Sequence, residues 1–163
     1  MTAALLCVAS VTACMRPVAP EPAVIRSSPP PWDAPRDAVS YIEAAGLTAD
    51  PLNTTGESHI VSMTVVVDGW RVPIPAYVGM DRLRAQQAAV HTHDTTNQVW
   101  LEGRDIDSVT LGQFFTLWGV RFDDRCLGAA CGEVVVTADG QAVSEPRSLP
   151  LTRASTVTVT ARS

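Results

Sequence analysis

Two of the three histidines in the chain, His91 and His93, are separated by a single residue and are followed directly by Asp94. In an extended segment, residues i and i+2 face the same side, so both imidazoles would be directed at one point. Such a pair is typical of a transition-metal site, which needs at least one further ligand. The remaining histidine, His59, could supply a third nitrogen, and Asp94 could supply a fourth ligand or a carboxylate that orients a ring. The competing interpretation is a polar strand end with hydrogen-bonded or solvated histidines.

Imidazole ligands favour Zn or Cu, and a thioether from Met63 or Met80 would shift the preference toward Cu(I). The residue types therefore predict a metal-binding protein that holds Zn or Cu. A three-histidine zinc site with an open position could also hydrolyse a substrate, with Glu102 as the nearby acid. The chain has no nucleophile elbow, phosphate loop or H-E-x-x-H motif, so we do not predict an enzyme. The alternative function is a non-catalytic module that binds a protein or another component of the cell envelope.

The composition limits the class of protein and its partners. The chain has 163 residues, of which 46% are hydrophobic, so it can form one domain with a substantial core. The net charge is -5, and all 12 basic residues are arginines that are spread along the chain. Because no basic cluster is present, we do not expect a nucleic-acid partner.

The N-terminal region predicts export and a lipid anchor. Residues 3–13 form an apolar run that is too short to span a bilayer and is typical of a signal peptide, although no basic residue precedes it. The run ends in Val-Thr-Ala-Cys, which resembles the bacterial lipobox, in which the cysteine becomes the lipidated first residue. We therefore predict a signal peptide over 1–14 and attachment through Cys14 to the extracytoplasmic face of the membrane. Residues 15–35 hold seven of the 12 prolines and predict a tether, which leaves a single domain over 36–163.

Cys126 and Cys131 enclose four residues, a spacing that lets a tight loop bring two sulfurs to bonding distance. Export to an oxidising compartment favours a disulfide between them. The alternative is a two-thiolate metal site, which would need further nitrogen or sulfur ligands nearby.

The periodicity of apolar residues predicts an α+β fold. A capping box at Thr110 and Gln113 starts the clearest helix, which carries an aromatic stripe and ends at Gly119. Turn signals at 68–69 and 139–140 predict two hairpins. The expected elements are helices over 33–46 and 110–119, one or two helical turns over 81–87, and strands over 59–67, 70–74, 98–101, 134–143 and 156–161. We predict a mainly antiparallel sheet crossed by one helix, β-grasp-like, with a small β-sandwich carrying an inserted helix as the alternative.

The series His-Thr-His-Asp at 91–94, Leu-Gly-Gln-Phe-Phe at 111–115 and Trp-Gly at 118–119 resembles an uncharacterised family of exported bacterial proteins, many of them actinobacterial. The resemblance extends from about residue 44 to the C-terminus and includes the first hairpin and the cysteine loop. It implies a histidine-rich run on the first strand, facing the His-Thr-His-Asp segment. In this chain only His59 remains of that run, so the resemblance implies an altered metal site.

Overall fold

The computed structural model describes residues 18–163. The predicted signal peptide and the lipid-anchor cysteine, Cys14, lie outside the described residues. Within them, no helix has the length and hydrophobicity needed to cross a membrane.

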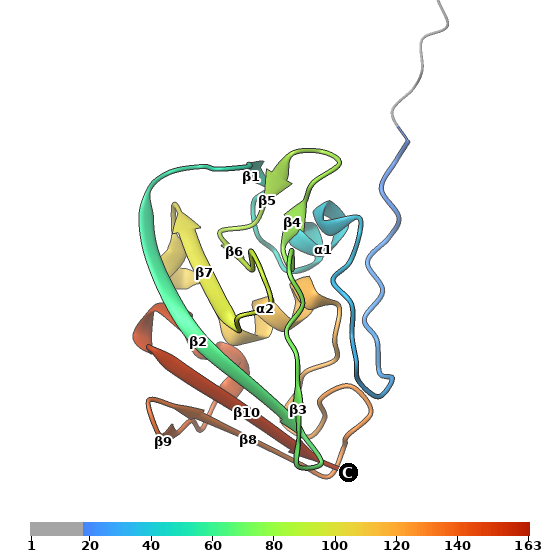
Figure 1. Ribbon diagram of the computed structural model, residues 1–163, viewed down its shortest axis with the longest axis vertical. Helices are drawn as coiled ribbons and strands as arrows, with labels where there is room; N and C mark the ends of the chain where they lie inside the picture. Colours follow the sequence, from blue (N-terminus) through green and yellow to red (C-terminus); the bar gives the residue numbers. More distant parts are fainter. Residues whose placement is uncertain (1–17) are drawn as a thin grey trace, which may run out of the picture.

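The chain folds as an α+β domain, as predicted, with two short α-helices and two sheets (Figure 1). The large sheet has the order β6-β7-β2-β10-β8-β9, with β3 also paired to β2, and the small one has the order β1-β5-β4. The α-helices are α1 (Ala38–Ala44) and α2 (Leu111–Trp118), and the 3-10 helices are η1 (Ile106–Ser108), η2 (Pro146–Ser148) and η3 (Leu151–Arg153). The strands are β1 (Asp50–Pro51), β2 (Glu57–Val67), β3 (Trp70–Val72), β4 (Met80–Asp81), β5 (Gln86–Gln87), β6 (Val90–His91), β7 (Gln98–Gly103), β8 (Glu133–Ala138), β9 (Gln141–Ala142) and β10 (Thr156–Arg162).

The centre of the large sheet is a parallel pair of strands, β2 and β10, each flanked by an antiparallel neighbour. Four strands lie side by side in the sheet in the order β7, β2, β10, β8. In the chain, β2 and β7 come first, then α2, and then β8 and β10. This is the β-grasp-like arrangement that was predicted. Figure 1 shows α2 behind the sheet, where its side chains join the same core as the inward residues of the strands.

Successive side chains of β2 and β10 point alternately to the two faces of the sheet. Met63 and Val65 of β2 and Val157 and Val159 of β10 are buried in the core, while the threonines between them on β10 face outward. Both hairpin turns fall where Asp-Gly predicts them, and Asp68 and Asp139 adopt the positive φ that such turns require. The alternation in the sequence of the longest strands therefore specifies which of their side chains face the core.

Helix α2 forms as its sequence predicts. The Thr110 side chain accepts a hydrogen bond from the Gln113 backbone, the Gln113 side chain accepts one from the Thr110 backbone, and Gly119 ends the helix in the left-handed conformation. Phe114, Phe115 and Trp118 are buried and in mutual aromatic contact. The stripe is part of the core.

Residues 81–87 do not form the predicted helical turns but a tight hairpin, in which β4 pairs with β5. The buried carboxylate of Asp81 accepts hydrogen bonds from the Arg84 backbone and from its guanidinium, which closes the turn. The same carboxylate accepts a hydrogen bond from the Val39 amide, at the start of α1. The bond to Val39 joins residues 42 positions apart, a contact that local sequence patterns do not contain. The predicted helix over 33–46 is correspondingly shorter and begins after Asp37.

The predicted boundary at residue 36 is wrong, because much of the proline-rich segment is part of the folded domain. Trp32 is only 2% exposed, stacks edge-on against Trp118 at 5.6 Å between ring centroids, and accepts the indole hydrogen bond of Trp118 on its carbonyl oxygen. The backbone of Arg26 pairs with that of Val120. The prolines favour an extended path for this segment. The Arg26 guanidinium docks it beside α2 by donating to the carbonyl oxygens of Trp118 and Gly119. Figure 1 shows the segment as the blue tube on the right.

The predicted disulfide joins Cys126 and Cys131 in a loop that packs beneath the same N-terminal segment. Gly128 in this loop adopts a positive φ, and an added Cβ would lie 2.4 Å from the Trp32 ring. The closed loop therefore supports the docking of Trp32.

We predict that Phe115→Ala lowers the free energy of unfolding by about 3–5 kcal/mol, the usual range for emptying a buried aromatic site. Phe115 contacts Phe122 at 4.4 Å between ring centroids as well as the other rings of α2. Denaturant unfolding measures the change, and Val135→Ala, at a 43% exposed position, is the control that should cost less than about 1 kcal/mol. An equally small loss for Phe115→Ala would contradict its placement in the core.

We predict that replacing both Cys126 and Cys131 with alanine costs about 2–3 kcal/mol of stability, because the open chain gains freedom in the unfolded state. The comparison is made by denaturant unfolding under non-reducing conditions. Adding a thiol reductant should lower the stability of the native chain but leave that of the variant unchanged. A variant as stable as the native chain would show that the bond does not stabilise the fold.

Candidate metal centre

His91, the first histidine of the pair, is fixed in one tautomer by a backbone carbonyl. Its side chain is fully buried, and its Nδ1 lies 3.0 Å from the Ala88 carbonyl oxygen. A carbonyl can only accept, so Nδ1 carries the hydrogen and Nε2 is left with a free lone pair. A backbone carbonyl or a carboxylate behind a ring is the usual support of a metal-binding histidine. The Ala88 carbonyl supplies this support to His91.

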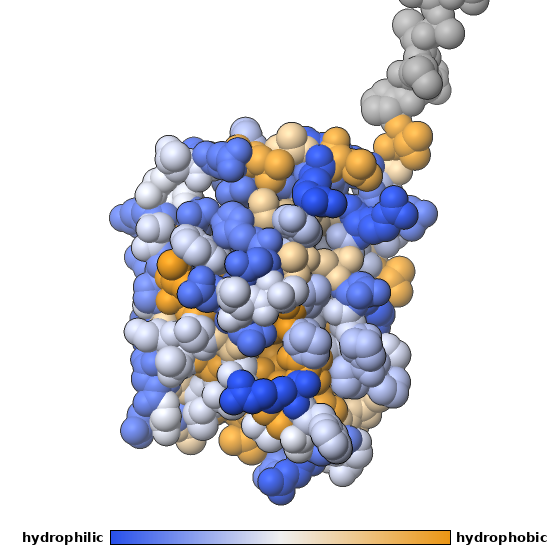
Figure 2. All heavy atoms as spheres, in the orientation of Figure 1, coloured by the Kyte–Doolittle hydropathy of each residue, from blue (hydrophilic) through white to orange (hydrophobic). Residues whose placement is uncertain are grey.

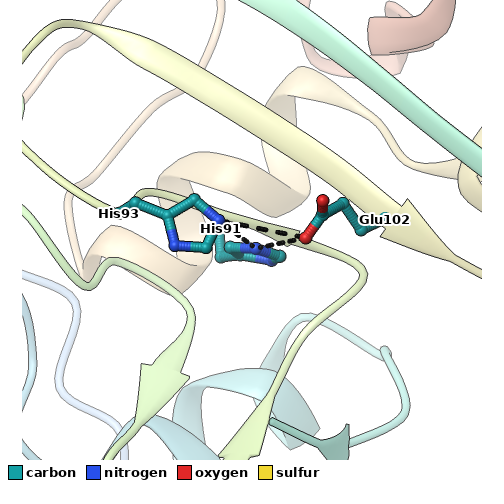
Figure 3. Close-up of side chains that lie close together, drawn as sticks. All are labelled: His91, His93 and Glu102. Atoms are coloured by element: carbon teal, nitrogen blue, oxygen red, sulfur yellow. Dashed lines mark hydrogen bonds and ion pairs between the residues drawn. The ribbon is translucent and has the colours of Figure 1, made fainter. Parts of the chain in front are cut away.

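Three ligand atoms converge at the free nitrogen of His91 (Figure 3). Nε2 of His91 lies 3.3 Å from Nε2 of His93 and 3.2 Å from Oε2 of Glu102. The third edge of the triangle, between His93 and Glu102, is 3.9 Å long. These are the only three side chains among residues 18–163 that form a group of this kind.

The group brings together more lone pairs than hydrogens. Nε2 of His91 has no hydrogen in the tautomer that Ala88 fixes, and a carboxylate of Glu102 only accepts. His93 can place at most one hydrogen among the three atoms. Burial lowers the pKa of His91 below its ordinary value and outweighs the opposite effects of the Ala88 carbonyl and Glu102, so this ring is neutral near pH 7. A cation between the three atoms would remove the repulsion between their lone pairs.

The hairpin of β6 and β7 determines which side chains meet. His91 pairs with Trp100 across the two strands, so its side chain is on the same face as Trp100 and Glu102. His93 lies just beyond the end of β6, and its ring packs edge-on against Trp100 at 5.2 Å between centroids. The amide of Glu102 donates to the Ala89 carbonyl at 2.8 Å, which holds the two strands together beside the site.

Thr92, the residue between the histidines, has a structural role on the opposite side. Its buried hydroxyl donates to the Pro75 carbonyl and accepts from the Val78 amide, which holds the 75–79 loop against the hairpin. Gly79 completes this contact, since an added Cβ would lie 2.5 Å from the Val90 carbonyl oxygen. The loop therefore packs closely against the segment that carries His91.

His59 does not join the group, so the three-histidine site predicted from the sequence is not formed. In the register of β2 and β7, His59 pairs with Leu101 and therefore lies on the core side of the sheet, opposite to Glu102. Its ring nitrogen lies 2.8 Å from the Ala154 carbonyl oxygen near the start of β10. Met63 lies on the same face of β2 as His59, and this face is the one that points away from the site.

Asp94 also serves a different purpose from either predicted role. Its carboxylate accepts hydrogen bonds from the backbone amide and the hydroxyl of Thr96, which stabilise the turn between β6 and β7 and lower the pKa of Asp94. It is not a ligand candidate. Glu102 takes the third position. The sequence indicates it only as a nearby acid that shares a strand face with Trp100, and the pairing of β6 with β7 puts this face on the side of the histidines.

Comparison with known proteins adds no relative to this description: no family model, no curated protein and no solved structure matches the chain. The chemistry of the site therefore has to be inferred from its own atoms.

We predict that metal binding at this site weakens as the solution is acidified, because imidazole must be unprotonated to bind a metal ion. Since burial lowers the pKa of His91, this ring is still mainly neutral at pH 6.5, and protons compete for it only below that value. Calorimetric titration with Zn²⁺ at steps from about pH 7.5 to about pH 5 measures the trend. An affinity that does not change over this range would contradict ligation by histidine.

Proposed function

We propose that this chain is an extracytoplasmic lipoprotein that binds one divalent transition-metal ion, Zn²⁺ or Cu²⁺, between His91, His93 and Glu102. The observation that carries the proposal is the convergence of three ligand atoms on the lone pair of a buried, neutral imidazole. A structural role alone does not account for a carboxylate oxygen 3.2 Å from a nitrogen without a hydrogen.

The spacing of the three atoms fits an ion of the zinc class. Two ligands at about 2.0–2.1 Å from a tetrahedral ion lie about 3.3–3.4 Å apart. The two edges at His91, 3.2 and 3.3 Å, match this separation, and the 3.9 Å edge between His93 and Glu102 is between the two more exposed side chains. A small rotation of either side chain would shorten this distance to the value expected for a tetrahedral ion.

The donor set favours a divalent ion over Cu(I). Two imidazoles and one carboxylate are nitrogen and oxygen ligands, whereas Cu(I) prefers sulfur. Met63, which could have supplied a thioether, is buried in the core on the side of β2 that faces away from Glu102. Met80 lies in β4, which pairs with β5 in the small sheet and not with the strands that carry the three ligands.

The proposed location is supported by the sequence and by the disulfide. The lipobox-like Val-Thr-Ala-Cys at 11–14 motivates lipid attachment at Cys14. A disulfide such as Cys126–Cys131 is typical of proteins that fold in an oxidising compartment.

The alternative function, a module that binds an envelope partner without metal, has less support. An exposed aromatic patch would favour it, but Trp32 and Trp118 are buried and only Trp70, at 80%, is largely exposed. On the face in Figure 2, apolar residues occur in small groups among polar ones. Such scattered apolar residues are normal for a protein surface.

Calorimetry with Zn²⁺ and Cu²⁺ on the protein without a histidine tag tests the metal proposal. We predict binding of one ion, and a loss of affinity of more than about a hundredfold for His93→Gln, because even indirect partners of a metal site are worth 10- to 100-fold. His59→Gln and Asp94→Asn are matched controls that should bind as the native chain does. Absence of binding, or equal loss in His59→Gln, would refute the assignment of the three ligands.

The location is tested separately with Cys14→Ser. We predict that this change releases the protein from the membrane fraction into the soluble or secreted fraction, because one side chain carries the whole lipid anchor. Fractionation followed by immunoblotting measures it, with Cys7→Ser as the control that should stay with the membranes. Unchanged membrane association of Cys14→Ser would rule out the lipobox.

A further inference from the structure

The N-terminal segment is held on the surface of the domain up to Val18, the first residue that the structure describes. The Tyr41 hydroxyl, on α1, accepts from the Val24 amide at 3.1 Å and lies 3.3 Å from the Val24 carbonyl oxygen. The guanidinium of Arg84, in the turn between β4 and β5, donates to the Val18 carbonyl oxygen at 3.4 Å. Figure 1 shows the chain entering at the end of the domain that carries this hairpin.

Arg84 also joins this end of the domain into one unit. Its guanidinium donates to Asp37, just before α1, at 2.7 Å and to Asp81 in β4 at 3.0 Å. One side chain therefore connects the N-terminal segment, the start of α1 and the β4–β5 hairpin. The two carboxylates are paired within the protein.

An anchor at Cys14 leaves little chain between the bilayer and this end of the domain. Val18 follows Cys14 by four positions, and four extended residues span at most about 14 Å. The acyl chains of a lipidated cysteine enter the bilayer, so the cysteine itself stays at the bilayer surface. Because the rest of the predicted tether follows the domain, it does not hold the domain away from the lipid.

Two large side chains with apolar surface are exposed at this end. Leu83, in the β4–β5 turn, is 75% exposed, and Tyr77 is 39% exposed. Both border one hollow of about 370 Å³, which is lined by residues 33–36, 75–77, 80 and 82–83. Tyr77 has a positive φ of 69°, so the loop keeps this residue in a conformation that a tyrosine rarely adopts.

The charges that border the hollow differ in sign from those of the whole chain. Its lining has two arginines, Arg36 and Arg82, and one acid, Asp33, whereas the chain has a net charge of -5. The Arg82 guanidinium lies over the Tyr77 ring at 4.2 Å from its centroid. Tyrosine and arginine are suited to the level of lipid headgroups, because each has an apolar body and a polar end.

We propose that the surface formed by Leu83, Tyr77, Arg82 and Arg36 docks on the phospholipid bilayer that holds the anchor. Leu83 enters the boundary between headgroups and acyl chains, and the two arginines contact lipid phosphates. This inference rests on the proposed lipid attachment at Cys14 and adds the face that the domain turns to the membrane. The anchor keeps the surface at a high local concentration of lipid, so a weak contact is sufficient.

The test uses the full lipidated chain in phosphatidylcholine nanodiscs that contain a phosphatidylcholine with a diazirine near its headgroup. Illumination attaches this lipid to nearby residues, and mass spectrometry of the peptides locates the adducts. We expect adducts on residues 75–84 as well as on the segment next to Cys14. Residues 67–72, in the β2–β3 hairpin, should carry none, although Trp70 in that hairpin is 80% exposed.

Leu83→Glu separates docking from attachment alone. We expect this change to lower the adduct yield on residues 75–84 by about three- to tenfold, because a charge replaces the apolar side chain that enters the lipid. Trp70→Glu is the matched control, an equally drastic change at another exposed site, and should leave the yield unchanged. Arg82→Glu should lower the yield as well, and more so at low salt. Denaturant unfolding checks that all three variants are folded.

Failure of the anchor and failure of the docking are distinguishable. If the chain does not co-purify with nanodiscs, the proposed attachment at Cys14 fails. If the segment next to Cys14 carries adducts but residues 75–84 do not, the anchor stands and the docking proposal is overturned, as it would be if a second copy of the chain covered this surface. An unchanged yield in Leu83→Glu, or an equal loss in Trp70→Glu, would also overturn it.

Discussion

The hydrogen bond from Nδ1 of His91 to the Ala88 carbonyl is the constraint on which the candidate site depends. It determines which nitrogen keeps its lone pair, and the β6–β7 hairpin directs that lone pair at His93 and Glu102. Burial then keeps the ring neutral. Without the carbonyl, the ring could carry its hydrogen on Nε2 and satisfy Glu102 as an ordinary hydrogen-bond donor, and no cation would be needed.

The segment that carries His91 packs against the loop at 75–79, and this loop is held by the middle residue of the His-Thr-His motif. Thr92 bonds to Pro75 and Val78, while the Gly79 carbonyl accepts from the Ala88 amide at 2.8 Å. These hydrogen bonds therefore hold the loop and also tie down the backbone of Ala88, the residue whose carbonyl orients the ring. Within the motif, the two histidines contribute ring nitrogens to the group, and the threonine between them holds the loop.

The sequence predicted features that depend on neighbours along the chain. The capping box at Thr110, the left-handed end at Gly119 and the turns at Asp68 and Asp139 all involve residues a few positions apart, and all are present. Residues 81–87 and the boundary at 36 were predicted wrongly because their structure depends on residues that are far away in sequence. Asp81 is bonded to α1, and Trp32 is packed on Trp118, which lies far from it in sequence. Local propensity does not contain such contacts.

For the site, the sequence by itself determined that His91 and His93 act as a pair, because a two-residue period on an extended segment is a local property. It also placed Glu102 on the face of Trp100. Only the tertiary structure decided which third side chain completes the group. In the observed register Leu101 pairs with both His59 and Val90, so the outward Glu102 meets the histidines while His59 points into the core side. A shift of that pairing by one residue would exchange the two faces, and strand register is set by the packing of the whole sheet.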